Sequence, residues 1–233
     1  YAALLVDESG QKHTEIKGLD MKRREYCALS KHVSSYVLEQ ILSGDATEMV
    51  VARIHEHLRQ VADDVHAGRV PLDDFVIFKR LGKRPQDYPD AGSQPHVQVA
   101  LRMLAKNESA RSGDVIPYVF CVGAGAGAGA GSDAKMSQAV RAYHPDDVRR
   151  HVGEDAYAID YRYYLAHQIL PPIERIAESI EGTDRARLAE CLGLDVHAYT
   201  TPSGGEVATA GREFAPLDSQ VPSAVRYAQC EPL

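Results

Sequence analysis

Basic and aromatic residues gather in three short segments of a chain that is acidic overall. Residues 17–24 and residues 79–84 each contain four Lys or Arg, and residues 86–97 add Tyr88 and His96. The formal net charge of the whole chain is -7 at pH 7, so solubility gives no reason to concentrate cations in this way. The segments therefore indicate a local polyanion-binding face, and a nucleic-acid backbone is the polyanion we expect.

The spacing of Lys79 and Lys83 suits a row of phosphates. In an extended chain the two side chains lie on one side, about 13 Å apart at a rise of about 3.3 Å per residue. Tyr88 and His96 would add neutral hydrogen-bond donors, which fix register on a backbone without reading its sequence. The alternative is that these cations only keep a surface soluble, and composition does not decide between the two.

Other groupings of reactive residues carry no catalytic chemistry. His55 and His57 are two residues apart on a predicted helix and do not face one another. Neighbouring Asp pairs such as Asp63 and Asp64 diverge in the same way, so none forms a two-metal carboxylate site. The alternating Gly/Ala tract at residues 123–131 lacks the helix and the acidic residue of a dinucleotide site. We predict no catalytic residue and no metal site in this chain.

The cysteines and the lengths of the apolar runs indicate the cellular environment that the sequence suits. Four Cys lie far apart without zinc-site spacing, which indicates free thiols in a reducing environment. No apolar run approaches the roughly 20 residues that cross a bilayer, so we expect no membrane partner. The chain begins on a strand-like run without Met, and we interpret it as a piece of a longer intracellular protein.

Periodicity predicts a mainly helical chain with a few strands. Residues 1–7 and 12–18 form a predicted hairpin, and apolar residues every three or four positions predict helices at about 25–43 and 45–68. The further predictions are a short buried strand or turn at 75–78, a helix around 97–104, a strand at 113–122, a helix over 160–181 interrupted by Pro171 and Pro172, and a helix over 183–192. The fold class is α+β, mainly α.

Several motifs resemble the family B DNA polymerases. Residues 17–20 (KGLD) and 23–25 (RRE) are similar to the end of the palm in that family, with Glu25 in place of the usual Asp. Motifs similar to the thumb of one eukaryotic replicative branch are at residues 86–90, 95–100, 141–143, 163–169 and 192–195. Residues 226–231 resemble the approach to a C-terminal zinc module. The likeness runs collinearly over about residues 1–195, and the Gly/Ala tract departs from it.

This resemblance implies a domain organisation and a function. Residues 1–25 would end the palm as a β-hairpin, residues 26–195 would form a helical thumb, and residues 196–233 would be a flexible linker towards a zinc module. The thumb would grip the primer-template duplex, either DNA or an RNA/DNA hybrid, during DNA replication in the nucleus. The residues expected to bind nucleic acid are Tyr1, Lys17, Arg23, Arg24, Lys79, Lys83, Tyr88 and His96, with Lys22, Arg80 and Arg84 as weaker candidates.

The catalytic machinery would lie elsewhere in the parent polymerase. No Asp-x-Asp element of the metal-binding kind occurs here, so this piece would not itself transfer nucleotides. The resemblance implies Mg²⁺ in the parent active site, zinc in its C-terminal module, and primase and accessory subunits bound through other parts of the parent chain. This piece would need no cofactor of its own.

Two other functions remain open from the sequence. A helical protein-interaction module would use the acidic second half, with Tyr157, Tyr161, Tyr163 and Tyr164 as its contact surface, although these positions fall on more than one helical face. A free-standing enzyme would need catalytic groups that the sequence does not show.

Overall fold

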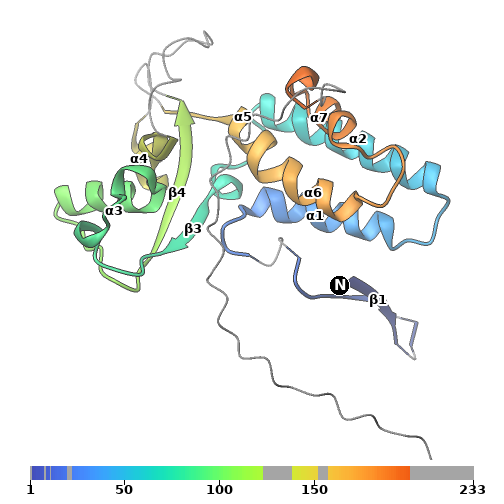
Figure 1. Ribbon diagram of the computed structural model, residues 1–233, viewed down its shortest axis with the longest axis horizontal. Helices are drawn as coiled ribbons and strands as arrows, with labels where there is room; N and C mark the ends of the chain where they lie inside the picture. Colours follow the sequence, from blue (N-terminus) through green and yellow to red (C-terminus); the bar gives the residue numbers. More distant parts are fainter. Residues whose placement is uncertain are drawn as a thin grey trace, which may run out of the picture. The chain divides into compact units, whose positions relative to one another are not determined.

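The computed structural model describes residues 2–7, 9–10, 12–19, 23–122, 138–151 and 157–199 (Figure 1). Residues 1–200 form one compact unit. The predicted Gly/Ala loop and most of the predicted linker lie outside the described residues, as do Tyr1 and Lys22. The described chain extends past the predicted linker boundary, because Val196–Ala198 (η8) form a 3-10 turn.

The predicted N-terminal hairpin is confirmed. Strands β1 (Ala2–Val6) and β2 (Lys12–Ile16) pair antiparallel, with Ala2 opposite Ile16 and Val6 opposite Lys12. Gly10 has a φ of +81°, which glycine adopts without steric cost, and its amide donates to the Asp7 carbonyl over 3.0 Å.

Four helices pack together in the helical part of the fold (Figure 1). They are α1 (Ala28–Ile41), α2 (Thr47–His66), α6 (Leu170–Ala177) and α7 (Arg185–Cys191). In α2 the residues Ile54, Leu58 and Val65 are fully buried, and their spacings of four and seven place them on one helical face. The sequence predictions for α1 and α2 are therefore confirmed.

A small sheet is built around one long strand. Strand β4 (Val115–Val122) pairs antiparallel with β3 (Ile77–Arg80) along its first half. Its second half pairs with two short strands, β5 (Ala142–Tyr143) and β6 (Ala158–Ile159). The strand predicted at 113–122 is confirmed, but β5 and β6 were not predicted.

A π-helical turn joins the sheet to the helices. Short helix α5 (Tyr161–Tyr163) continues into the π turn η7 (Tyr164–Ile169) and then into α6. Pro171 and Pro172 lie in the first turn of α6, directly after η7. The predicted interruption therefore lies before the two prolines, in the wider turn of η7.

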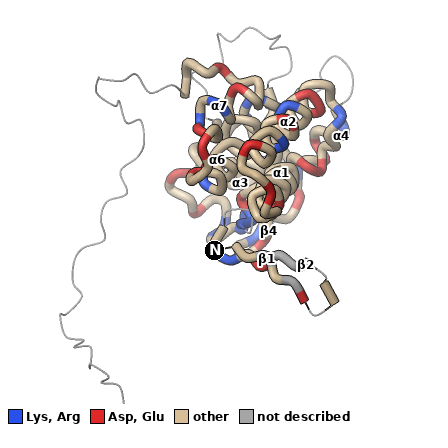
Figure 2. Tube along the Cα trace, turned by 90° about the vertical axis from the view of Figure 1, so that its right-hand side faces the viewer, with Lys and Arg blue, Asp and Glu red and all other residues tan. Residues whose placement is uncertain are grey.

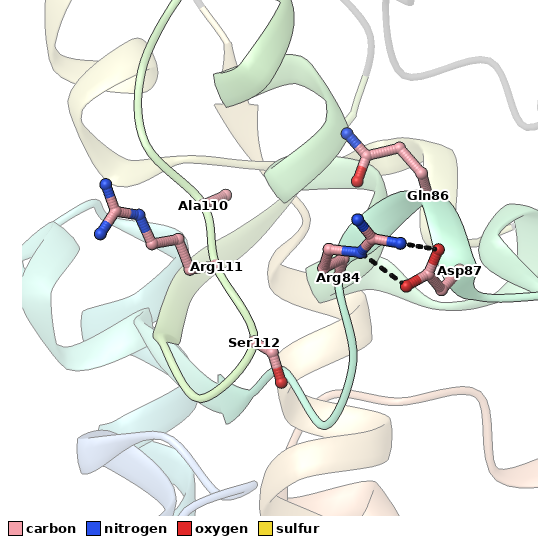
Figure 3. Close-up of a pocket in the computed structure, with 6 residues that line it drawn as sticks. All are labelled: Arg84, Gln86, Asp87, Ala110, Arg111 and Ser112. Carbon is pink, nitrogen blue, oxygen red and sulfur yellow. Dashed lines mark hydrogen bonds and ion pairs between the residues drawn. The ribbon is translucent and has the colours of Figure 1, made fainter.

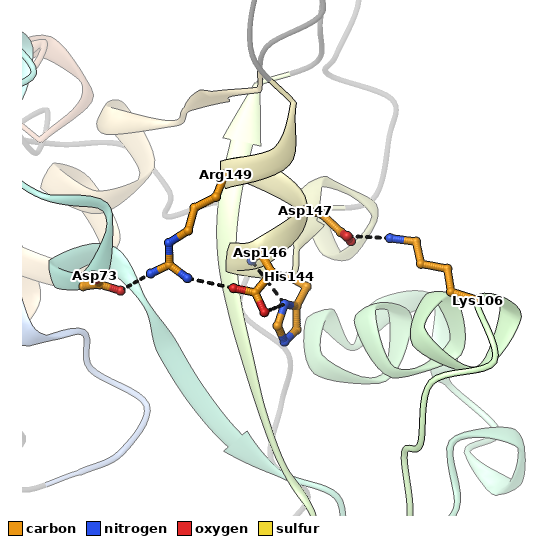
Figure 4. Close-up of polar contacts among 6 residues, drawn as sticks. All are labelled: Asp73, Lys106, His144, Asp146, Asp147 and Arg149. Carbon is orange, nitrogen blue, oxygen red and sulfur yellow. Dashed lines mark hydrogen bonds and ion pairs between the residues drawn. The ribbon is translucent and has the colours of Figure 1, made fainter.

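The sheet is flanked by α3 (Pro95–Ala105) and α4 (Pro145–Arg150), drawn near β4 in Figure 1. Ion pairs hold α4 in place, as Figure 4 shows: Lys106 pairs with Asp147 over 2.5 Å, and Arg149 bridges Asp146 and Asp73. Asp73 belongs to the 3-10 turn η2 (Leu72–Phe75). Three further 3-10 turns are η3 (Pro85–Asp87), η4 (Ala91–Ser93) and η6 (Gln138–Arg141).

One hydrophobic core runs through both parts of the fold. Tyr164 is fully buried in it, and its hydroxyl accepts a 3.0 Å hydrogen bond from the Phe120 amide of β4. The α+β, mainly α fold is confirmed. None of the described helices is long and apolar enough to cross a membrane.

Candidate nucleic-acid interface

The basic segment 79–84 begins in strand β3 and continues past its end, at the edge of the sheet. Lys79 and Arg80 lie within β3, and two hydrogen bonds continue the ladder beyond it: Leu81 N donates to Asp114 O over 2.8 Å, and Gly113 N donates to Leu81 O over 2.7 Å. The chain then bends at residues 82–83. The prediction of one extended path from Lys79 to Lys83 is therefore wrong. Strand β3 ends at Arg80, and the chain bends at residues 82–83, so the two lysines do not lie on one strand.

Contacts bring three basic segments together. Lys79 Nζ lies 3.5 Å from Glu25 Oε1, which joins β3 to the segment that contains Arg23 and Arg24. Arg80 Nε donates to the Gly113 carbonyl over 3.0 Å, which joins β3 to the loop before β4. We call the cations of these segments the basic cluster: Arg23, Arg24, Lys79, Arg80, Lys83, Arg84 and Arg111. All except Lys79 are exposed, and Lys79 is half-buried.

The sequence did not point to Arg111. The turn before β4 brings it to the same open hollow as Arg84, a space of about 590 Å³ that Ser112 also lines (Figure 3). Arg84 donates to both carboxylate oxygens of Asp87, over 2.8 and 3.2 Å, and these bonds hold the pKa of Asp87 below its usual range. Arg111 is far from residues 79–84 in sequence, so only the pairing of β3 with β4 could have revealed it.

The segment before α1 is anchored to the π turn. The Cys27 amide donates to Gln168 Oε1 over 3.0 Å, and Ser30 Oγ donates to the Gln168 carbonyl over 2.5 Å. Arg175 of α6 donates to the Tyr26 hydroxyl over 2.9 Å. Arg23 and Arg24 therefore directly precede residues 26–30, which these hydrogen bonds anchor to η7 and α6. Figure 2 shows Lys and Arg positions near β4.

The predicted contacts Tyr88 and His96 face inward. The His96 side chain is only 2% exposed, and burial lowers its pKa to about 4, with Lys79 as the next cause. Tyr88 packs edge-on against the His96 ring, with centroids 6.0 Å apart, and its hydroxyl accepts hydrogen bonds from Gly82 and Lys83. Both residues therefore support the basic cluster from beneath by packing, and neither is placed as a surface contact for nucleic acid.

The hairpin contributes the remaining predicted residue that the structure describes. Lys17 follows β2, its side chain is 71% exposed, and it pairs with Glu15 over 2.6 Å. Strands β1 and β2 pair with each other, and a contact of Lys17 with the nucleic acid bound at the basic cluster stays a prediction. Tyr1 lies outside the described residues.

The tyrosines of the alternative interaction surface pack wholly or partly against the hydrophobic core. Tyr164 is fully buried, Tyr163 stacks on Phe120 at 4.1 Å, and Tyr157 stacks on Tyr143 at 4.3 Å. Burial raises the pKa of Tyr163 to about 12. Tyr163 and Tyr164 connect the sheet to the π turn through Phe120, while Tyr157, Tyr161 and Tyr163 remain partly exposed.

The described residues contain neither a cluster of metal-ligating side chains nor a cysteine with a lowered pKa. No three His, Cys, Asp or Glu side chains stand together there in a way that could hold a metal ion. Cys27, Cys121 and Cys191 are free and buried, and burial raises the pKa of Cys27 to about 11 and that of Cys121 to about 12. Such thiols are poor nucleophiles near neutral pH.

Comparison with known proteins gives the class. Residues 1–180 match DNA polymerase family B. The chain belongs to that family, and the resemblance of its motifs is confirmed. Within it, the chain is 40% identical to the DNA polymerase alpha catalytic subunit of Oryza sativa subsp. japonica over 100% of its length, and 36% identical to the same subunit of Mus musculus over 99%.

A solved structure agrees with the sequence relatives. The family B DNA polymerase from the archaeon Pyrobaculum calidifontis superposes with a TM-score of 0.58 and 30% identity, over 77% of this chain and 20% of that one. The chain spans only 15% of the length of the rice and mouse subunits. It therefore corresponds to a small part of such a polymerase.

Proposed function

We propose that this chain is the part of a replicative DNA polymerase that holds the primer-template duplex. Residues 1–25 would end the palm, residues 26–195 would form the thumb, and residues 196–233 would lead towards a zinc module. One observation carries the proposal: in a family B chain, contacts join the segments of Arg23 and Arg24, Lys79 to Arg84, and Arg111 into a single basic cluster.

The cluster would bind through phosphates. Contacts to phosphate give affinity that does not depend on sequence, which suits a polymerase that must move along any template. Lys17, Arg23, Arg24, Lys79 and Lys83 would supply the charge, and Tyr1 would join them from the palm. The bound duplex would be DNA or an RNA/DNA hybrid, whose minor groove is wide and shallow.

Catalysis would belong to the parent protein. The parent would transfer nucleotides with Mg²⁺ held by residues outside this chain, and it would carry zinc in its C-terminal module. It would act in the nucleus and bind primase and accessory subunits through other parts. The chain alone would hold duplex without extending it.

A salt titration tests the proposal directly. Binding of the 233-residue chain to a fluorescent primer-template is measured by anisotropy at several salt concentrations. If about five phosphates are neutralised, log K falls against log salt with a slope near -4.5. Lys79→Ala with Lys83→Ala should reduce the size of that slope by about 1.8, since each phosphate contact contributes about 0.9.

The matched control removes the same charge elsewhere. Arg59→Ala with Arg69→Ala takes two exposed cations from α2 and the turn after it, where they pair with Glu56 and Asp64. This pair should leave the slope unchanged. Affinity that stays flat between low and moderate salt, or equal effects of the two double variants, would argue against a local duplex-binding cluster.

A further inference from the structure

We propose that the Tyr88 hydroxyl is a positioning group, which fixes the turn that presents Lys83 to a phosphate. The inference rests on the proposed function and assigns Tyr88 a role that involves no contact with nucleic acid. It follows from three observations: two hydrogen bonds to the turn, a fixed ring, and a second support on the other side of the turn.

The hydroxyl oxygen accepts two backbone hydrogen bonds. Gly82 N donates to Tyr88 Oη over 2.7 Å, and Lys83 N donates to the same atom over 3.3 Å. Two successive amides that point at one oxygen form the kind of concave donor pair that binds anions. Here a side chain of the protein occupies that position, so the amides hold the turn in place instead of binding a ligand.

The ring behind this hydroxyl cannot easily move. Tyr88 is partly buried against the hydrophobic core, and its ring meets the edge of the His96 ring at 6.0 Å with an interplanar angle of 86°. His96 is itself 2% exposed on the first turn of α3. The position of the hydroxyl is therefore set by the packing of the ring against His96 of α3.

The opposite side of the turn is held by the loop before β4. Ser112 Oγ donates to the Gly82 carbonyl over 3.2 Å, and Leu81 exchanges backbone hydrogen bonds with Gly113 and Asp114. The backbone of residues 81–83 is thus fixed from both sides, while the Lys83 side chain is exposed. A fixed backbone lowers the entropy lost when Lys83 meets a phosphate, which is how preorganisation increases affinity.

Tyr88→Phe in the 233-residue chain tests the role, because it removes one oxygen and keeps the ring. Amide hydrogen exchange of the free chain should become about tenfold faster at Gly82 and Lys83, as expected for the loss of one net hydrogen bond. Tyr36→Phe is the control, since Tyr36 lies on α1 and stacks on His57. It should leave exchange at Gly82 and Lys83 unchanged.

A double-variant cycle separates positioning from direct contact. Tyr88→Phe and Lys83→Ala should each weaken primer-template binding by about threefold to tenfold, and the two together should weaken it no more than Lys83→Ala alone. If the two effects multiply, Tyr88 acts on its own and the inference is overturned. Unchanged exchange at Gly82 and Lys83 in Tyr88→Phe would also overturn it.

The cycle also distinguishes this inference from the proposed function. If the unmodified chain does not bind the duplex at all, the proposed function fails, and the role of Tyr88 in binding fails with it. If the chain binds and only the cycle is multiplicative, the proposed function stands and the positioning role is lost.

Discussion

A buried histidine, His96, packs against Tyr88 and lies close to Lys79 of the basic cluster. Burial is the main reason that the pKa of His96 falls to about 4, with Lys79 acting in the same direction and Asp90 and Glu25 acting against it. Among the residues that the structure describes, its buried Nδ1 atom finds no hydrogen-bond partner. The imidazole is therefore uncharged at neutral pH and contributes through packing.

This histidine should make the chain less stable in acid. The folded pKa is lower than the unfolded value of 6.5, so the unfolded chain takes up the proton first. The free energy of unfolding should be constant above about pH 6.5 and fall by on the order of 2 kcal/mol towards pH 4 on account of this residue. Urea unfolding at several pH values measures the slope.

Replacement of His96 isolates its share of that slope. His96→Phe should flatten the dependence of the unfolding free energy on pH between 6.5 and 4, whereas His32→Phe, at an exposed position on α1, should not. His55, His57 and His167 also have pKa values lowered by burial, so part of the slope remains in both variants. An equal slope in His96→Phe and the unmodified chain would contradict the assignment.

If the chain holds a duplex as proposed, Glu25 would compete with it for Lys79. The two side chains are 3.5 Å apart and both are substantially exposed, so the pair contributes at most about 1 kcal/mol. Glu25→Gln should therefore tighten primer-template binding by about threefold to fivefold at low salt. Glu48→Gln makes the same charge change at the start of α2 and should have a smaller effect; equal gains would mean that only net charge matters.

At the scale of elements, the π turn η7 is hydrogen-bonded to the segment that precedes and begins α1. Gln168 lies in this turn, is 7% exposed, and accepts the hydrogen bond from the Cys27 amide just before α1. A buried amide that loses its only side-chain acceptor costs about 1–3 kcal/mol. The turn therefore holds the segment of Arg23 and Arg24 in place.

Gln168→Leu should lower the free energy of unfolding by about 1–3 kcal/mol, measured by urea denaturation, because it leaves the Cys27 amide unsatisfied. Gln60→Leu, which removes an exposed hydrogen bond to Asp64 on α2, should cost well under 1 kcal/mol. A neutral Gln168→Leu would show that water or another acceptor replaces the side chain.

Strongly periodic elements and the turn-marked hairpin could be predicted from the sequence, and the two-residue strands could not. The helices α1 and α2 follow from apolar residues that repeat every three or four positions. Strands β5 and β6 have two residues each, too few to show an alternation, and they exist because β4 offers free backbone groups along its second half. The π turn likewise depends on tertiary packing that periodicity does not encode.

The same limit applies to the candidate site. Clustered cations such as Lys79 and Lys83 are visible in sequence, but whether a residue faces solvent depends on the turn that follows β3 and on the packing of α3. His96 and Tyr88 were therefore predicted as contacts, although they pack inward, and Arg111 was missed because it reaches the cluster only through the pairing of β3 with β4.

At the scale of the whole molecule, charge is unevenly distributed. The net charge is -7, and residues 112–233 hold the entire excess of Asp and Glu, while residues 1–111 contain equal numbers of both signs. Long-range attraction of a polyanion is therefore weak, and binding must come from close contacts at the basic cluster. The affinity should be modest and should depend on the phosphates alone.

Such a molecule should not distinguish between sequences. Phosphate contacts position a protein without reading bases, so two DNA duplexes of equal length and unrelated sequence should bind with dissociation constants within about threefold of each other. An RNA/DNA hybrid of the same length should fall in that range, because it offers the same density of phosphates. Competition against one labelled primer-template measures all three, and a preference of more than about tenfold for one DNA sequence would mean that side chains of the chain contact base edges.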